Sequence, residues 1–111
     1  MANTEKVLQI RRLNDALRRK GQGGRMYLTR GIVALGSETV TRILAAVVAF
    51  DDFTPDNDPY GEHDCAALEV EGYRVLWKID YYNEDMSAGS ADPADPSITS
   101  RVLTVMLQEE Y

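Results

Sequence analysis

The single histidine of the chain, His63, lies between two carboxylates and is the residue best suited to acid–base chemistry. If Glu71 and Gly72 form a two-residue turn, counting outward along the hairpin brings His63 opposite Asp80. An adjacent carboxylate stabilises the imidazolium and fixes its tautomer, as a general acid or base requires. Glu62 precedes the histidine, and Lys78 lies one pair further along the hairpin. Together these residues predict a candidate catalytic set of a hydrolase or nuclease-like enzyme.

Other interpretations of His63 are a structural contact that pins the loop to a strand, a metal ligand, and a contact to a partner. Residue counts argue against several familiar sites. One histidine and one cysteine, Cys65, are too few for the four ligands of a structural zinc site. The acidic stretch lacks the carboxylate spacing of a calcium-binding EF-hand loop, and a Walker loop and a serine-nucleophile motif are both missing. We predict no cofactor and no metal. Binding of Mg²⁺ or Mn²⁺ remains an alternative only at the carboxylate oxygens of Asp58, Glu62, Asp64 and Asp80.

Carboxylates gather in two segments rich in Pro, Asn and Asp. The first, residues 51–64, holds six carboxylates and no Lys or Arg, and the second spans residues 83–97. Carboxylates along a rigid edge can stand in for phosphates against a groove of Lys and Arg, with salt-sensitive association. This predicts a protein partner with a basic surface, contacted by Asp51, Asp52, Asp56, Asp58, Glu84, Asp85, Asp92 and Asp95.

Charge is divided unevenly along the 111 residues, which carry a net charge of −6. Residues 1–42 hold nine Lys or Arg and three Asp or Glu, whereas residues 43–111 hold three and fifteen. The division suits charged partner surfaces or head-to-tail association in a homodimer, or it reflects charges that interleave on one surface. Direct nucleic-acid binding through the basic first helix is disfavoured, because affinity comes largely from phosphate neutralisation.

The length and the apolar fraction of 44% predict one α+β domain over residues 1–111. Helices are expected at 4–20, with a basic outer face and a cap at Asn3 or Thr4, at 37–50, capped by Ser37, and at 96–110. A small antiparallel sheet is expected from a hairpin at 65–82 and a strand near 26–35, with Gly31 a bulge or a close approach. Residues 101–107 also fit a strand, and the helix is the favoured alternative. With one cysteine, no apolar leader and no membrane span, the expected location is the cytoplasm.

Three segments resemble a family of small bacterial proteins known as domain of unknown function 3768, frequent in alphaproteobacteria. They are Asp58-Pro59-Tyr60-Gly61-Glu62-His63-Asp64, residues 77–82 and residues 101–107. Members usually continue the first motif with Phe-Gly, where this chain has Cys65-Ala66. The resemblance implies a setting on plasmids and other mobile elements. By analogy with small acidic anti-CRISPR and antirestriction proteins, we expect a non-catalytic inhibitor of a nucleic-acid-handling defence complex.

Overall fold

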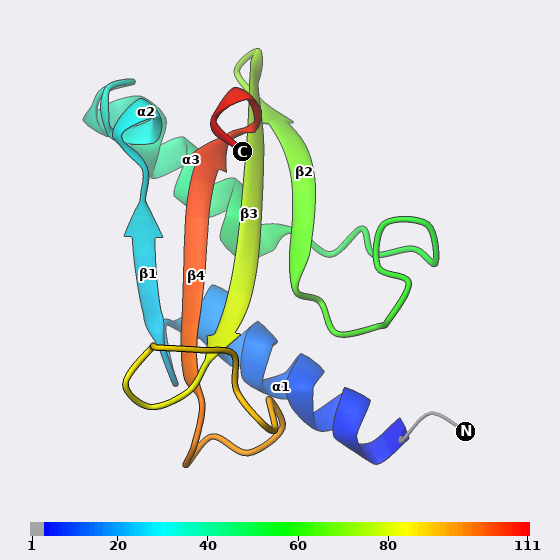
Figure 1. Ribbon diagram of the computed structural model, residues 1–111. Coiled ribbons are helices and arrows are strands. Elements are labelled where there is room, and N and C mark those ends of the chain that lie inside the picture. Colours follow the sequence, from blue (N-terminus) through cyan, green and yellow to red (C-terminus); the bar gives the residue numbers. More distant parts are fainter. Residues whose placement is uncertain (1–3) are drawn as a thin grey trace.

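The computed structural model describes residues 4–111 as a four-stranded sheet with its longer helices on one face (Figure 1). The strand order is β1-β4-β3-β2, with β1 parallel to β4 and the other neighbours antiparallel. The predicted α+β class, a small sheet packed against helices, is confirmed, and the sheet is mixed. In chain order the elements are α1 (Thr4–Lys20), β1 (Arg25–Leu28), α2 (Arg30–Val33), α3 (Ser37–Ala49), β2 (Cys65–Val70), β3 (Tyr73–Tyr82), β4 (Ser100–Leu107) and the 3-10 helix η1 (Gln108–Glu110).

Both long helices form where the apolar spacing predicts them. In α1, Ile10 and Leu17 are buried, and Gly21 with φ 67° ends the helix by donating its N–H to Leu17 O at 2.9 Å. The predicted cap at Asn3 lies outside the described residues. The predicted cap of α3 at Ser37 is wrong. Gly36, with φ 93°, occupies the N-cap position and has no side chain that could form a capping hydrogen bond. Within residues 4–111, no helix has the length and apolar character needed to cross a membrane.

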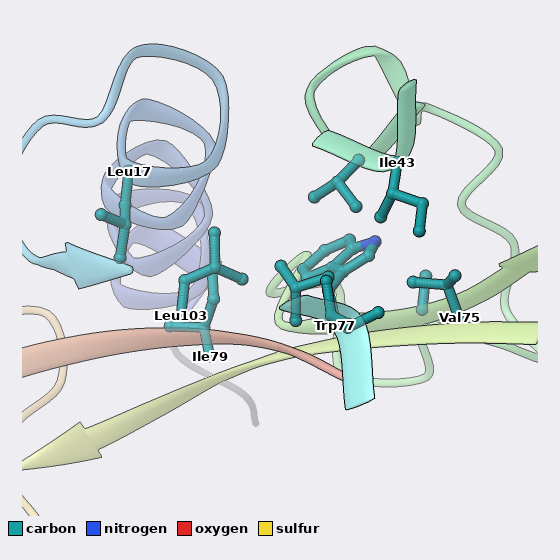
Figure 2. Close-up of a cluster of buried hydrophobic side chains, with 10 residues drawn as sticks. Leu17, Ile43, Val75, Trp77, Ile79 and Leu103 are labelled. Carbon is teal, nitrogen blue, oxygen red and sulfur yellow. The ribbon is translucent and has the colours of Figure 1, made fainter. Parts of the chain in front are cut away.

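The hairpin formed by β2 and β3 is confirmed in its register. Glu71 and Gly72 have φ angles of 52° and 84°, as a primed two-residue turn requires, and Glu69 faces Arg74. Alternate residues therefore point to opposite faces of the sheet. The inner face, packed against the helices, carries Trp77, which is fully buried. Figure 2 shows its indole in the hydrophobic core, with Ile43 of α3 on the helix side.

The predicted helix at 96–110 is wrong, because residues 100–107 form the strand β4 between β1 and β3. Residues 95–98 form a turn, in which the Asp95 carboxylate accepts the N–H of Ser97 at 2.9 Å. Leu103 and Val105 point to the inner face, opposite Ile79 and Trp77, and both are fully buried. Their burial beside two strands far away in the chain favours the extended conformation over a helix.

The predicted strand at 26–35 is correct only for residues 26–28, since β1 ends at residue 28 and α2 follows. Thr29 caps α2, and its hydroxyl accepts the N–H of Ile32 at 3.4 Å. Gly31 is part of this helix and not a bulge. A Cβ on Gly31 would lie 2.6 Å from the carboxyl group of Glu110. That carboxylate accepts hydrogen bonds from the Thr29 hydroxyl at 2.6 Å and from the Gly31 N–H at 3.0 Å. The close approach of Glu110 therefore leaves no room for a side chain at residue 31.

Candidate functional site

His63 lies in a contact between the loop before β2 and the helix α1. Its Nδ1 atom is 3.0 Å from Oδ1 of Asp15, and because a carboxylate only accepts, Nδ1 carries the proton. Its Nε2 atom faces Oδ2 of Asp58 at 3.7 Å. The imidazole also stacks on the ring of Phe53, with 3.8 Å between centroids and 5° between planes. Both ring nitrogens therefore face carboxylates of the protein itself.

The predicted pairing of His63 with Asp80 is wrong. The β2–β3 ladder begins at Cys65 opposite Lys78, and one further bond joins Ile79 N–H to Asp64 O at 2.7 Å. His63 then adopts a left-handed backbone with φ 55°, which turns its side chain out of the alternation of the strand and toward α1. Asp80 instead accepts a hydrogen bond from Lys78 on the outer face of the sheet, and this bond raises the pKa of Lys78.

The other member of the predicted set, Glu62, belongs to a buried hydrogen-bond network on the inner side of the sheet. Its carboxylate accepts the hydroxyl of Tyr81 at 2.8 Å. Asn14 of α1 donates Nδ2–H to Tyr81 Oη at 2.8 Å and to Glu62 O at 3.0 Å. Burial raises the pKa of the Tyr81 hydroxyl. The four predicted catalytic residues therefore belong to two separate groups on opposite faces of the sheet.

Arg101 of β4 extends the same network. It is 2% exposed, and its Nε–H donates to Asn14 Oδ1 at 2.7 Å, while Nη2 donates to Pro93 O. Its guanidinium carbon lies 5.1 Å from the centroid of the Tyr81 ring, and burial lowers the pKa of Arg101. Asn14 is fully buried and serves as the junction of donors and acceptors from α1, β3, β4 and the loop.

Arg18 of α1 is a second buried cation, although the sequence predicts a basic outer face for this helix. Its Nη1 donates to the carbonyls of Val47, Val48 and Phe50 at 2.8, 3.2 and 2.9 Å, so it caps the C-terminal end of α3. The guanidinium carbon lies 4.9 Å from the centroid of the Trp77 ring. Burial lowers the pKa of Arg18, and the charge of Asp15 opposes this effect.

The predicted partner-binding carboxylates divide into three sets. Asp58 is only 8% exposed and accepts the backbone N–H of His63 at 3.2 Å, so its prediction as a surface contact is wrong. Three others accept backbone N–H groups two residues further on, at 2.9 to 3.1 Å, and thereby shape the second loop: Asp85, Asp92 and Asp95. The remaining members, Asp51, Asp52, Asp56 and Glu84, are exposed, as is Asp85.

A shallow groove of about 430 Å³ runs beside the histidine. It is lined by His63, Asp58, Pro55, Pro59 and Tyr60, and Tyr60 is 78% exposed. The described residues contain no group of three or more His, Cys, Asp or Glu that could hold a metal ion. The ring nitrogens of His63 face Asp15 and Asp58, which compete with any ligand in the groove for these atoms. The arrangement suits contact with a partner surface better than acid–base chemistry.

These contacts predict a structural effect for His63→Ala. Removing the imidazole deletes the hydrogen bond to Asp15 and the stack on Phe53, and we expect a loss of about 2 kcal/mol of unfolding free energy. Hydrogen exchange should accelerate over residues 53–62. His63→Asn is the matched control, since Asn tolerates the left-handed backbone and keeps an N–H donor. Unchanged exchange in His63→Ala would refute the structural role.

Sequence reasoning missed Asn14, Asp15 and Arg101, which complete the site from helix α1 and strand β4. The first helix did contain a signal. Asn14 and Arg18 lie four and eight residues after Ile10, on the stripe that the helix turns inward. A polar side chain within an apolar stripe is usually buried together with its hydrogen-bond partners.

A family model described as "Protein of unknown function (DUF3768)" matches residues 28–110. The match includes β2, β3, β4 and the loop that carries His63, whereas α1 lies outside the matched residues. The comparisons with curated proteins and with solved structures found no match.

Proposed function

Because the chain belongs to this family of proteins of unknown function, we propose its function from its own geometry. It is a non-catalytic binding protein that presents the acidic segment, residues 51–64, to a basic surface of a protein partner. The observation that carries the proposal is the contact of His63 with Asp15 and Asp58. The histidine fastens the end of the segment to the helix, and the segment in turn displays the carboxylates of Asp51, Asp52 and Asp56 to solvent.

The segment is braced at several further points. Arg11 Nε–H donates to Gly61 O at 2.7 Å, and Asn57 Nδ2–H donates to Asp52 O at 2.8 Å. The Asn57 side chain also accepts the N–H of Thr54 at 2.8 Å. A loop held in this way loses little conformational entropy on binding, which favours affinity. The exposed ring of Tyr60 adds an aromatic anchor of the kind that contributes strongly at protein interfaces.

In its specific form, the proposal is an inhibitor of a nucleic-acid-handling defence complex, of the anti-CRISPR or antirestriction type. The carboxylates of Asp51, Asp52 and Asp56 would occupy a Lys/Arg groove that otherwise holds phosphates. The exposure of all three side chains supports this form. So does the absence of Lys and Arg from the segment, since a cation there would repel such a groove.

Reversal of the three exposed charges tests the proposal. We expect the triple variant Asp51→Lys, Asp52→Lys and Asp56→Lys to lose inhibition, measured as plasmid transformation or phage plating in cells with an active CRISPR or restriction system. The matched control, Glu38→Lys, Glu69→Lys and Glu109→Lys, changes the net charge equally at exposed sites elsewhere and should retain inhibition. Equal inhibition by both variants would contradict the role of the segment, and no inhibition by the unmodified protein would contradict the anti-defence form.

A further inference from the structure

The edge strand β1 is unusually exposed for a strand of a packed sheet. It lies at the end of the order β1-β4-β3-β2, and three of its four residues are exposed. Tyr27 and Met26 are each 48% exposed, on opposite faces of the strand. Edge strands in monomeric proteins are usually protected by Lys, Pro or a bulge. The only charged residue of β1 is Arg25, at its first position.

The free side of β1 presents a regular set of backbone groups. Thr29 N–H donates to Val105 O at 3.1 Å, which shows that Thr29 points its backbone toward β4. Backbone groups alternate along a strand, so Arg25 and Tyr27 also point toward β4. The N–H and C=O groups of Met26 and Leu28 therefore project away from the sheet, where they can accept and donate hydrogen bonds to another strand.

We propose that two copies of this chain pair through their β1 edges in an antiparallel, two-fold symmetric arrangement. One register satisfies the backbone of both copies. Met26 of each copy faces Leu28 of the other as a hydrogen-bonded pair, and the two Tyr27 residues face each other at the two-fold axis. The two sheets then join into one. The central tyrosine pair is a cross-strand aromatic contact of a stabilising kind.

Charge complementarity at the ends of the strand supports the same register. Arg25 of one copy lies opposite Thr29 of the second, on the outer face of the joined sheet. The Thr29 hydroxyl donates to the carboxylate of Glu110 at 2.6 Å, so an anion lies beside the position that Arg25 faces. The hydroxyl and the N–H groups of Leu107 and Gly31 lower the pKa of Glu110, which keeps it ionised. Each dimer thus gains two Arg25–Glu110 pairs between copies.

The opposite edge of the sheet is less suited to a second copy. Strand β2 leads directly from the acidic segment, and two such segments with six carboxylates each would approach if the β2 edges paired. Like charges that face each other across an interface oppose association. The β1 edge lies on the other side of the sheet, away from this segment (Figure 1). Dimerisation therefore leaves the proposed partner-binding surface free and is independent of it.

The mass of the protein in solution tests the proposal. Light scattering after size exclusion should give twice the 12.4 kDa of one chain, independent of any partner. Tyr27→Lys places two ammonium groups opposite each other and should weaken association at least about tenfold. Tyr73→Lys is the matched control, because Tyr73 is a strand tyrosine of similar exposure, 41%, at the far hairpin, and it should remain dimeric.

Disulfide trapping provides a second readout that does not depend on weakening the interface. In a Cys65→Ala background, Tyr27→Cys should form a covalent dimer on mild oxidation, because a non-hydrogen-bonded pair brings the two Cβ atoms close enough. Tyr73→Cys should stay uncross-linked. A monomeric mass for the unmodified protein, or a dimer that survives Tyr27→Lys, would overturn the proposal. A covalent dimer formed equally by the Tyr73→Cys variant would also overturn it.

Discussion

Asn14→Leu is expected to destabilise the protein by about 4 kcal/mol, because it leaves the buried guanidinium of Arg101 without its Nε acceptor. The same change removes the donor to Tyr81 Oη and to Glu62 O. Leucine has the same number and branching of side-chain heavy atoms as asparagine, so the main property that the change removes is hydrogen bonding. A domain of this size has an unfolding free energy of roughly 5–15 kcal/mol, so the variant would lie near the limit of folding.

Urea denaturation followed by circular dichroism measures this effect. Gln9→Leu provides the control, since it removes an amide from the same helix, and the oxygen of that amide accepts an exposed hydrogen bond from Arg12. We expect that variant to remain within about 0.5 kcal/mol of the unmodified protein. Equal unfolding free energies for the two variants would show that the buried network contributes little to stability.

Arg18→Met is expected to cost about 3 kcal/mol and to loosen the start of the acidic segment. Methionine keeps much of the side-chain volume but leaves the carbonyls of Val47, Val48 and Phe50 without their shared donor. Since Phe50 immediately precedes the segment, hydrogen exchange over residues 50–56 should accelerate. This change would connect the stability of α3 with the geometry of the proposed binding surface.

The neighbouring cation provides the control. Arg19 is exposed at the end of α1, and Arg19→Met should change the unfolding free energy by no more than about 0.5 kcal/mol. If Arg18→Met were equally stable and exchanged at the normal rate, the buried charge would be dispensable. A buried cation replaced by an apolar side chain can be neutral when its partners find water, so the exchange measurement is the sharper readout.

The elements that local patterns define were predicted from the sequence. The hairpin follows from alternation on both sides of Glu71-Gly72, and its register holds for all six pairs of β2. Helices α1 and α3 follow from apolar spacing with a period of 3.6 residues. Residues 101–107 satisfied both patterns, and only the neighbouring strands β1 and β3 decide that they form β4.

The candidate site was predicted only in part, because its contacts join distant residues. His63 was the right residue to single out, but its partner Asp15 lies 48 residues away. Counting along the hairpin fails at His63 because its backbone turns left-handed two residues before β2 begins. In the same way, the acidic segment was recognised from its composition. The burial of Asp58, however, depends on how the chain turns at His63, whose N–H the Asp58 carboxylate accepts.

The parallel pairing of β1 with β4 has a consequence for how the protein is made. On the ribosome, β1 emerges long before its neighbour, because Arg25 pairs with Val102 more than 70 residues later. Until β4 has been synthesised, Met26 and Tyr27 have no strand to join, and the apolar inner face of β3 lacks one of its neighbours. Pairings this distant close slowly. We therefore expect nascent chains to depend on chaperones that bind this apolar surface while it is exposed.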